Sequence, residues 1–578
     1  MLQFDDVLSH VLGDFGTYQK FCFILLGLTS ITEVLQSFSP VYIQAYTDHW
    51  CAVPYADQVS LLACNGTYPQ ASADCEELVK NLTIPRETVD DGCGEVSAFS
   101  SCERYDASIE EVLHPSAPAP YRNRTVSCDY GWEYDTSQYK STVTQQFDLV
   151  CDRYYLNTLS MSIYMLGSLV GGPIYGFVMD KYGRMPGLMC AFVLMTIFGV
   201  MQALSVNFTM FMISRSLLSI SSYSVYAGGF VLAAEFVGPR RRTLAGMIFP
   251  MFYSLGYMLL TFYAYFIREW WILQLVITVP DILFLTYWWI VPESPRWLLS
   301  SGQDEKAEKI IRKCAKINKV EVPANLFDGT WEPPDDGKPK EPTIYDTQED
   351  NSASHSALDL VRLPNMRKKT LIMFYIWTTN SLIYYGISFN TSALAGDDYL
   401  NALLSALVEI PAYAAAIFIM DFRYLGRRGS LLITMVTSGV GCICAVLVPS
   451  CDELEWLEVM FTMIGKFAIT ASYGMIYVYT AELFPTPVRA TAIGFCSVCS
   501  CIGGALAPQL IFFSRFWEPL PFFVFGFTAI LAGVLTLLLP ETRNAKLPET
   551  LEEGEMFGKK PKKEKEIRGF DNLAMTGT

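Results

Sequence analysis

Two loops of similar sequence, Asp180-Lys-Tyr-Gly-Arg184 and Asp421-Phe-Arg-Tyr-Leu-Gly-Arg-Arg428, indicate how this chain folds. They lie about 240 residues apart, and each follows an apolar run long enough to cross a bilayer. Two more pairs repeat at nearly that separation: Ala234-Glu-Phe-Val-Gly-Pro-Arg240 with Ala481-Glu-Leu-Phe-Pro-Thr-Pro-Val-Arg489, and Pro292-Glu-Ser-Pro-Arg296 with Pro540-Glu-Thr-Arg543. Three motif pairs in one order predict two halves in parallel repeat.

The composition is typical of a membrane protein. Of the 578 residues, 51% are hydrophobic and only 17% are charged, whereas soluble domains carry about 25% charge. A bilayer core needs about 20 apolar residues per helix, and helices satisfy the backbone groups that lipid cannot. Twelve runs are long enough: 20–45, 155–178, 187–206, 209–235, 244–267, 271–291, 370–390, 400–420, 430–449, 456–481, 488–513 and 519–539. We predict an all-α membrane protein with twelve transmembrane helices in two six-helix halves.

Lys and Arg in short loops mark the cytoplasmic side of a membrane protein. Here they cluster on one side, at Lys181, Arg184, Arg240 to Arg242, Arg423, Arg427, Arg428 and Arg489. We therefore expect a plasma-membrane protein, monomeric, with both termini in the cytoplasm. The predicted order is a cytoplasmic N-terminus (1–19), a first helix (20–45), an extracellular loop (46–152), the rest of the N-terminal half (153–291), a cytoplasmic linker (292–369), the C-terminal half (370–539) and a cytoplasmic tail (540–578).

The predicted extracellular loop, 46–152, carries the marks of the secretory route. It contains seven cysteines, which are Cys51, Cys64, Cys75, Cys93, Cys102, Cys128 and Cys151. It also contains three glycosylation sequons, at Asn65, Asn81 and Asn123. Together they predict a glycosylated, disulfide-stapled cap in an oxidising compartment. Seven is odd, so one cysteine is free or pairs elsewhere, and the spacing leaves the connectivity open.

The repeated loops combine acids with arginines at helix ends. Such groups can form charge-assisted contacts in one conformation and break them in another. We interpret eleven of them as a conformational latch: Asp180, Arg184, Glu235, Arg240, Glu293, Arg296, Asp421, Arg427, Glu482, Arg489 and Glu541. The alternative is that they set topology and form ordinary surface pairs, although topology alone does not require the acids.

An ionisable residue within a predicted span is expensive and indicates function, and we single out three such residues. Glu409 precedes Pro411 in span eight, and a buried carboxylate is a natural counter-charge for an ammonium group. Glu33 in span one could supply the same affinity. Lys466 in span ten could pair with Glu409 or bind a carboxylate. The alternative for each is a structural role between helices, where losing one partner of a buried pair is costly.

Several stretches resemble one transporter family. Gly176-Phe-Val-Met-Asp-Lys-Tyr-Gly-Arg184 and Pro292-Glu-Ser-Pro-Arg-Trp-Leu-Leu299 are similar to signatures of the major facilitator superfamily. Leu404-Ser-Ala-Leu-Val-Glu-Ile-Pro-Ala-Tyr413 and Gly465-Lys-Phe-Ala-Ile-Thr-Ala471 resemble the organic cation, anion and carnitine transporters, and most closely the carnitine and novel organic cation branch. The resemblance covers about residues 1–550. It implies a major facilitator fold with a central substrate cavity.

Aromatic residues on the spans that line the cavity in this fold class are further candidates. They are Tyr226, Trp377, Tyr384, Tyr385, Tyr473 and Tyr477. Aromatic faces hold quaternary ammonium ions with about 0.5–2 kcal/mol per contact, and a tyrosine hydroxyl can meet a carboxylate or water. Packing and interface anchoring are the alternatives.

The chain departs from the family pattern at two places. On span eleven, the resemblance places Cys501 where cation carriers have Asp and anion or carnitine carriers have Arg. The sodium-coupled carnitine carriers look to have Asn where this chain has Glu33 and Val225. These differences argue against inherited sodium coupling, and the coupling ion, sodium or proton, stays open.

The expected function is secondary transport of small organic cations or zwitterions, such as carnitine, by alternating access. An organic-anion transporter or exchanger of the same family, and a non-transporting sensor, are the alternatives. With only four His and no glycine-rich nucleotide loop or nucleophile elbow, we expect no enzyme, cofactor or metal. A net charge of −16 without a basic face excludes nucleic acid as a partner. The partners are then the bilayer and a small substrate.

Overall fold

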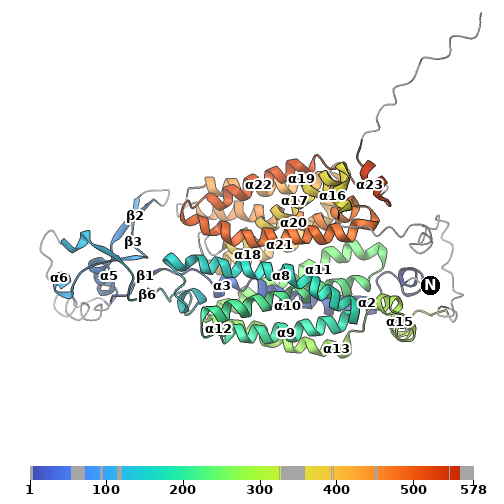
Figure 1. The fold of residues 1–578 in the computed structure, drawn as a ribbon, viewed down its shortest axis with the longest axis horizontal. Coiled ribbons are helices and arrows are strands. Elements are labelled where there is room, and N and C mark those ends of the chain that lie inside the picture. Colours follow the sequence, from blue (N-terminus) through green and yellow to red (C-terminus); the bar gives the residue numbers. More distant parts are fainter. Residues whose placement is uncertain are drawn as a thin grey trace, which may run out of the picture.

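The fold is that of a long helical bundle with a small domain at one end (Figure 1). The computed structural model describes residues 4–53, 72–90, 95–113, 120–323, 326, 358–391, 394, 396–449, 454–545 and 547–559. The end of the bundle that carries the segment between the first two long helices is here the cap end. The opposite end, where the N-terminus and the last described helix lie, is the tail end.

The N-terminal half has six membrane-length elements. They are α2 (Thr17–Ser37) with α3 (Pro40–Ile43), α8 (Tyr154–Tyr182), α9 (Arg184–Ala203), α10 (Phe208–Glu235), α11 (Pro239–Phe266) and α12 (Trp270–Thr278). The last element continues through a 3₁₀ stretch, η4 (Val279–Thr286), into α13 (Tyr287–Ile290). Pro280 lies in this stretch and cannot donate a backbone hydrogen bond, which accounts for the break in the α-helix.

The C-terminal half repeats the arrangement. Its helices are α17 (Pro364–Phe389), α18 (Asp398–Met420), α19 (Gly426–Leu447), α20 (Glu455–Leu483), α21 (Thr486–Phe512) and α22 (Leu520–Thr536). Short 3₁₀ turns flank two elements, η3 (Cys151–Arg153) before α8 and η6 (Phe513–Arg515) after α21.

The predicted twelve-helix architecture is confirmed. Within the described residues, ten elements have the length and hydropathy of a membrane span. The two others are α17 and α22. Helix α17 begins six residues before the predicted span and takes in the charged Arg367, Lys368 and Lys369, whereas α22 is a shorter apolar helix.

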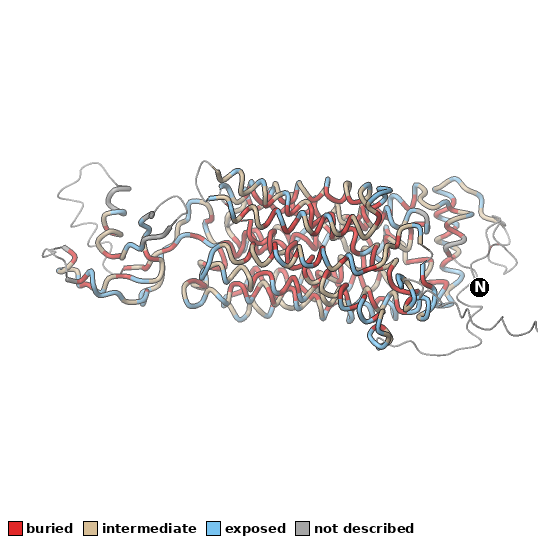
Figure 2. Tube along the Cα trace, turned by 90° about the horizontal axis from the view of Figure 1, so that it is seen from above, coloured by how far each residue is buried: buried red, intermediate tan, exposed pale blue. Residues whose placement is uncertain are grey.

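Burial follows the axis of the bundle (Figure 2). Buried positions lie along the centre, and intermediate or exposed ones face outward. Many outward side chains are large and apolar, such as Phe177, Trp289 and Phe527. An apolar outer face suits lipid, whereas the centre is polar as well as apolar and includes Glu33, Glu409 and Lys466. A polar interior in an apolar coat is the arrangement expected when the interior carries the function.

The cap is a small domain rather than an open loop, and its β-structure was not predicted. Three antiparallel two-stranded ribbons form it: β1 (His49–Cys51) with β6 (Trp132–Tyr134), β2 (Arg86–Asp90) with β3 (Glu95–Phe99), and β4 (Glu103–Tyr105) with β5 (Thr125–Ser127). The helices α5 (Ser72–Thr83), α6 (Ile109–Leu113) and α7 (Val143–Gln146) and the 3₁₀ turn η2 (Pro120–Asn123) complete it.

Short helices cover each half at the tail end. On the N-terminal half these are α1 (Phe4–Val7), the π-helical η1 (Leu8–Leu12), α14 (Pro295–Ser300) and α15 (Asp304–Asn318). Asn318 accepts a hydrogen bond from the Tyr18 backbone at 2.9 Å. On the C-terminal half, α16 (Asp359–Arg362) and α23 (Leu551–Met556) lie near the start of α17, where Glu555 accepts from the Met366 backbone at 2.9 Å. The segments outside the spans thus extend both bundles.

Candidate substrate site

Two predicted charges, Glu409 and Lys466, pair with each other. The Lys466 Nζ lies 2.8 Å from a Glu409 carboxylate oxygen, and both side chains are fully buried. Glu409 also accepts from the Ser254 hydroxyl at 2.7 Å, and Lys466 donates to the Ser388 hydroxyl at 2.5 Å. The Lys466 ammonium lies 3.7 Å from the centre of the Tyr384 ring. The pair is therefore neutral as a unit, and the face of Tyr384 is already occupied by a cation.

The helix geometry explains why these two residues meet. Glu409 and Lys466 each lie eleven residues after the first residue of their helix, α18 and α20. At 1.5 Å per residue, both lie about 16 Å along the axis from the cap end. Helices α18 and α20 are packed neighbours, so equal depth places the side chains side by side. Ser254 comes from α11 of the other half, and its bond to Glu409 joins the two halves at this depth.

Glu33 is an intramembrane acid without a cation partner among the described residues. It lies in α2, is 6% exposed, and forms no ion pair with any residue that the structure describes. Its polar neighbour on the next turn is Ser37, whose hydroxyl lies 3.1 Å from that of Tyr253. Glu33 is therefore a buried carboxyl group in the centre of the bundle that no described cation neutralises, and such a group is a candidate to meet a cation.

Tyrosines from both halves surround Glu33. Tyr226 and Tyr253, whose rings are 6.0 Å apart, interact electrostatically with it from the N-terminal half. Tyr385 and Tyr473 do so from the C-terminal half. Three of the predicted aromatic candidates, Tyr226, Tyr385 and Tyr473, are thus brought near one carboxyl group. An acid beside several aromatic residues is a combination that can bind an ammonium ion.

The remaining aromatic candidates extend this group towards the tail end. Trp377 packs edge-on against Tyr477 at 4.6 Å and donates its indole N–H to Thr480 at 3.0 Å. Tyr384 lies 5.3 Å from the Tyr473 ring. Trp377 is almost fully buried and has its donor satisfied, which is the behaviour of a packing residue.

Cys501 borders the aromatic group. It is a free, half-buried thiol on α21 that interacts electrostatically with Tyr473 and Tyr385. The preceding residue, Ser500, shares a 2.7 Å hydrogen bond with the Tyr473 hydroxyl. A neutral residue therefore stands beside the site at the span-eleven position.

The two halves meet at the cap end. The Tyr139 hydroxyl, in the cap, donates to Asp398 at the start of α18 at 3.0 Å. The rings of Tyr42 and Tyr399, one from each half, stack at 5.7 Å. Deeper in the bundle, Phe38 stacks on Tyr385 at 5.9 Å. These contacts close the site towards the cap.

The tail side of the site is less enclosed than the cap side. Tyr477 contacts Trp377 and interacts with Tyr226 across the interface between the halves, yet its side chain is 41% exposed. The site is therefore closed towards the cap and has an exposed side chain towards the tail end.

The predicted latch residues form two matching networks at the tail end, one in each half. Arg184 bonds to Asp180 at 2.6 Å and to Glu235 at 3.3 Å. Glu293 accepts from the Arg184 and Met185 backbones at 3.0 and 3.1 Å, and burial raises the pKa of its carboxyl, against the lowering by those N–H groups. One arginine thus joins the ends of α8, α9 and α10.

The C-terminal network uses equivalent residues. Arg427 bonds to Asp421 at 2.8 Å and to Glu482 at 3.3 Å. Glu541 accepts from the Arg427 and Arg428 backbones at 2.7 and 3.0 Å. The loop glycines, Gly183 and Gly426, explain the motif, because each has a positive φ (111° and 64°) and a Cβ there would strike Glu293 or Glu541.

Among the other latch candidates, Arg489 has a different partner. Arg489 donates to the Phe484 carbonyl at 3.3 Å instead of to a carboxylate. Arg296 lies in α14 at the same end. The side chain of Arg240 lies outside the described residues. Whether the networks break during transport stays a prediction.

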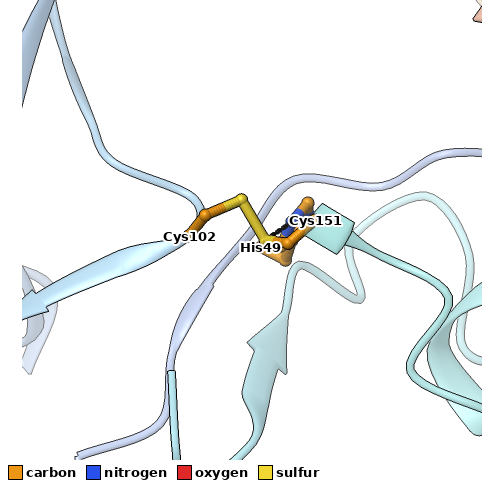
Figure 3. Close-up of side chains that lie close together, drawn as sticks. All are labelled: His49, Cys102 and Cys151. Carbon is orange, nitrogen blue, oxygen red and sulfur yellow. Dashed lines mark hydrogen bonds between the residues drawn. A yellow bond between two sulfur atoms is a disulfide. The ribbon is translucent and has the colours of Figure 1, made fainter. Parts of the chain in front are cut away.

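The cap contains two of the predicted disulfides within its described part, Cys51–Cys128 and Cys102–Cys151. They close loops of 77 and 49 residues, worth about 4 kcal/mol each in the chain-entropy model. His49 lies against the second disulfide, with Nε2 4.0 Å from Cys151 Sγ (Figure 3). The three side chains resemble a metal-ligand cluster, but the disulfide uses both thiols.

The cap also carries two of the predicted sequons in described positions. Asn123 is exposed, whereas Asn81 lies in α5 and its side-chain oxygen accepts from Arg86 at 2.8 Å. Asn65 lies outside the described residues, as do Cys64 and Cys93.

Sequence reasoning missed four residues of the site. Phe38, Tyr253, Ser254 and Ser388 all contact predicted members. They are neutral residues in apolar runs, so charge drew no attention to them. The pair Tyr253-Ser254 in mid-span was the available signal, because adjacent polar side chains there imply partners on other helices.

Two six-helix halves around a buried centre of acids and aromatic rings define a secondary transporter of the major facilitator type. The family model for sugar (and other) transporters matches residues 121–553. The organic cation transporter protein of Drosophila melanogaster is 40% identical, over 96% of this chain and 95% of its own length. Organic cation/carnitine transporter 2 of Homo sapiens is 34% identical, over 96% and 94%. The chain belongs to this family of transporters, among the organic cation and carnitine transporters.

Two further comparisons complete this assignment. The beta-alanine transporter of Drosophila melanogaster is 32% identical, over 96% of this chain and 89% of its own length. The structure of the proton:xylose symporter XylE, bound to 6-bromo-6-deoxy-D-glucose, matches with a TM-score of 0.54 at 16% identity, covering 93% of this chain and 99% of that one. The second likeness concerns the fold alone.

Proposed function

We propose that this protein transports small organic cations or zwitterions across the plasma membrane, with both termini in the cytoplasm. The observation that carries the proposal is Glu33, an uncompensated carboxylate surrounded by tyrosine rings in the centre of the bundle. The names of the relatives support it, since they are transporters of organic cations, carnitine and beta-alanine. The ammonium group of such a substrate would lie against Glu33, with Tyr226, Tyr253 and Tyr385 around it.

The structure changes the emphasis among the candidate acids. Glu409 is neutralised by Lys466 and bonded to Ser254. We therefore assign the substrate counter-charge to Glu33 and a structural role, tying the halves together, to the Glu409–Lys466 pair. With the cap end closed, the two matching networks around Arg184 and Arg427 hold each half's helix ends in register as the halves rock about the site.

We further propose that the membrane potential drives uptake without sodium. A single positive charge moving through 100 mV gains about 2.3 kcal/mol, which corresponds to an accumulation of roughly 50-fold. The positions of Glu33 and Val225 support this proposal, since a carboxylate and an apolar side chain stand where sodium-coupled relatives were expected to have amides.

Uptake by expressing cells tests the proposal. Labelled tetraethylammonium, carnitine and para-aminohippurate are offered with and without sodium, and at normal or collapsed membrane potential. We expect saturable uptake of the cation or of carnitine, indifference to sodium, and a fall of cation uptake on depolarisation. Saturable uptake of para-aminohippurate alone would show an organic-anion transporter and refute the proposal.

A further inference from the structure

Arg215, in the N-terminal half, is another ionisable side chain without a partner among the described residues. It is on α10 and 1% exposed. None of its three guanidinium nitrogens has a hydrogen-bond partner among the described residues, and no described carboxylate pairs with it. Arg215 packs against the ring of Tyr164 on α8, with 4.7 Å between the guanidinium carbon and the ring centre. Because burying an isolated cation is costly, such a group is retained where an anion can meet it.

Two hydroxyls on the Tyr164 side of Arg215 also lack a well-formed hydrogen bond to a described residue. They belong to Tyr164 itself, whose ring contacts Arg215, and to Ser222, and both residues are fully buried. The two hydroxyls lie close together, and Tyr164 interacts electrostatically with Arg215 on one side and Glu33 on the other. The cluster thus offers a guanidinium and two O–H groups, with no anionic acceptor among its own members.

Tight packing fixes this cluster. Gly167 and Gly171 on α8 let α10 approach so closely that the Ser219 side chain and the Ile220 carbonyl lie where their Cβ atoms would be. This contact sets Tyr164, one turn before Gly167, against Arg215. The hydroxyl of Ser219, also on α10, donates to the Ser216 carbonyl at 2.9 Å. A polar side chain near the cluster can thus find a backbone partner, which Arg215 does not.

The cluster lies on the cap side of Glu33. Thr29 on α2 and Gly229 on α10 lie at the same level, because a Cβ on Gly229 would strike the Thr29 hydroxyl. Glu33 is four residues closer to the cap end than Thr29, and Arg215 is fourteen residues closer than Gly229, so Arg215 lies about 15 Å nearer the cap end than Glu33. The two side chains, together with a molecule whose ammonium and carboxylate are joined by a few carbon atoms, would span this depth.

We propose that Arg215, Tyr164 and Ser222 form an anion subsite next to the Glu33 site, for a monovalent anionic group. The group is the carboxylate of a zwitterionic substrate or, in its place, a chloride ion. The guanidinium supplies charge and paired N–H donors, and the hydroxyls complete the shell. The inference deepens the proposed function and rests on it, because the carboxylate belongs to a substrate whose ammonium meets Glu33.

Substrate selectivity tests the subsite. Uptake of carnitine, β-alanine and tetraethylammonium is measured for wild type, Arg215→Gln and Tyr164→Phe. The matched control is Ser214→Ala, since the adjacent Ser214 hydroxyl donates to the Phe211 carbonyl at 2.9 Å. We expect Arg215→Gln to lower zwitterion uptake roughly ten-fold or more relative to tetraethylammonium, Tyr164→Phe to do so less, and Ser214→Ala not at all. An unchanged ratio in both test variants, at normal surface expression, together with wild-type uptake that does not respond to chloride, would overturn the subsite.

Replacing chloride with gluconate distinguishes the two anions. If the carboxylate is the ligand, zwitterion selectivity changes in Arg215→Gln and gluconate has no effect. If chloride is the ligand, gluconate lowers wild-type uptake of all three substrates, and Arg215→Gln abolishes that response.

A binding measurement separates failure of the subsite from failure of the proposed function. Carnitine or chloride should raise the melting temperature of the purified wild-type protein but not that of Arg215→Gln. If Arg215→Gln does not fold, Arg215→Lys replaces it, and its melting temperature should rise less than that of the wild type. Equal shifts in wild type and variants would overturn the subsite. Wild-type protein that takes up none of the three substrates would overturn the proposed function, while this shift still decides the subsite.

Discussion

The two halves of the protein agree at the tail end and differ in the middle of the membrane. At the tail end, Arg184 and Arg427 occupy equivalent places, each bonded to one aspartate and one glutamate. In mid-membrane, the C-terminal half carries the closed pair Glu409–Lys466, whereas the N-terminal half carries Glu33 without a cation partner among the described residues. The repeat is kept where both halves must move alike. It is lost where, in our proposal, one half supplies the substrate's counter-charge and the other supplies structure.

Breaking the closed pair should give the largest effect. Glu409→Gln leaves the Lys466 charge buried without its partner, which costs about 3–5 kcal/mol. We expect a large drop in the melting temperature of the purified protein. The double variant Glu409→Gln/Lys466→Met removes both charges and should recover most of the loss. A Glu409→Gln protein as stable as wild type would show that the pair does not hold the structure together.

Replacing the aromatic residues near Glu33 should give the next largest effect. Tyr226→Leu and Tyr385→Leu each remove a face that would hold an ammonium group. The expected rise in the KM for tetraethylammonium is about 2- to 30-fold, from 0.5–2 kcal/mol per contact. Tyr226→Phe keeps the face and serves as the matched control. Unaltered KM values in both leucine variants would remove these residues from the site.

The tail-end networks should affect turnover and leave affinity alone. Arg184→Ala and Arg427→Ala remove equivalent charge-assisted bonds in the two halves, far from Glu33. We expect each to lower the maximal uptake rate roughly ten-fold, with KM within about two-fold, since one or two such bonds are lost. Arg184→Lys and Arg427→Lys keep the positive charge but lose the planar guanidinium that bonds two carboxylates at once, so they test whether the bonding geometry matters. A KM effect as large as the rate effect would place the networks in binding.

The cap, which belongs to the N-terminal half in sequence, should give the smallest effect. Burial against the disulfide lowers the pKa of His49 below its ordinary 6.5. The unfolded chain therefore binds a proton at a higher pH than the folded cap. Stability falls as pH drops from about 6.5 to the folded-state pKa, and is level below it.

Thermal melts of wild type and His49→Gln between pH 5 and 8 check this. The wild type should lose stability at the acid end, and the variant should lose less. Parallel melts for both proteins would contradict the assignment to His49.

The sequence was enough for the architecture and for part of the site. Apolar runs and the three motif pairs predicted twelve helices in two halves, because bilayer thickness leaves few other solutions. Charge predicted Glu33, Glu409 and Lys466 as buried functional groups, but their partners depend on helix rotation and depth. The pairing of Glu409 with Lys466 needed equal depth on α18 and α20. That Glu33 has no cation partner among the described residues can be seen only when all its neighbours in the fold are known.

Two features lay beyond the reach of sequence patterns. The strands of the cap are only three to five residues long, too short to show alternation. Arg215 lies within the predicted span 209–235, among serines and apolar residues, and its position in the sequence does not show whether it has a partner. Its burial without a partner is a property of the packing between α8 and α10.

The central claim is that Glu33, and not the Glu409–Lys466 pair, is the substrate's counter-charge. The most direct test is uptake of labelled tetraethylammonium by Glu33→Gln beside Glu409→Gln/Lys466→Met, normalised to protein at the cell surface. We predict that Glu33→Gln lowers uptake ten-fold or more without loss of melting temperature, whereas the double variant keeps a large part of wild-type uptake. Uptake that survives in Glu33→Gln and disappears in the folded double variant would contradict the account.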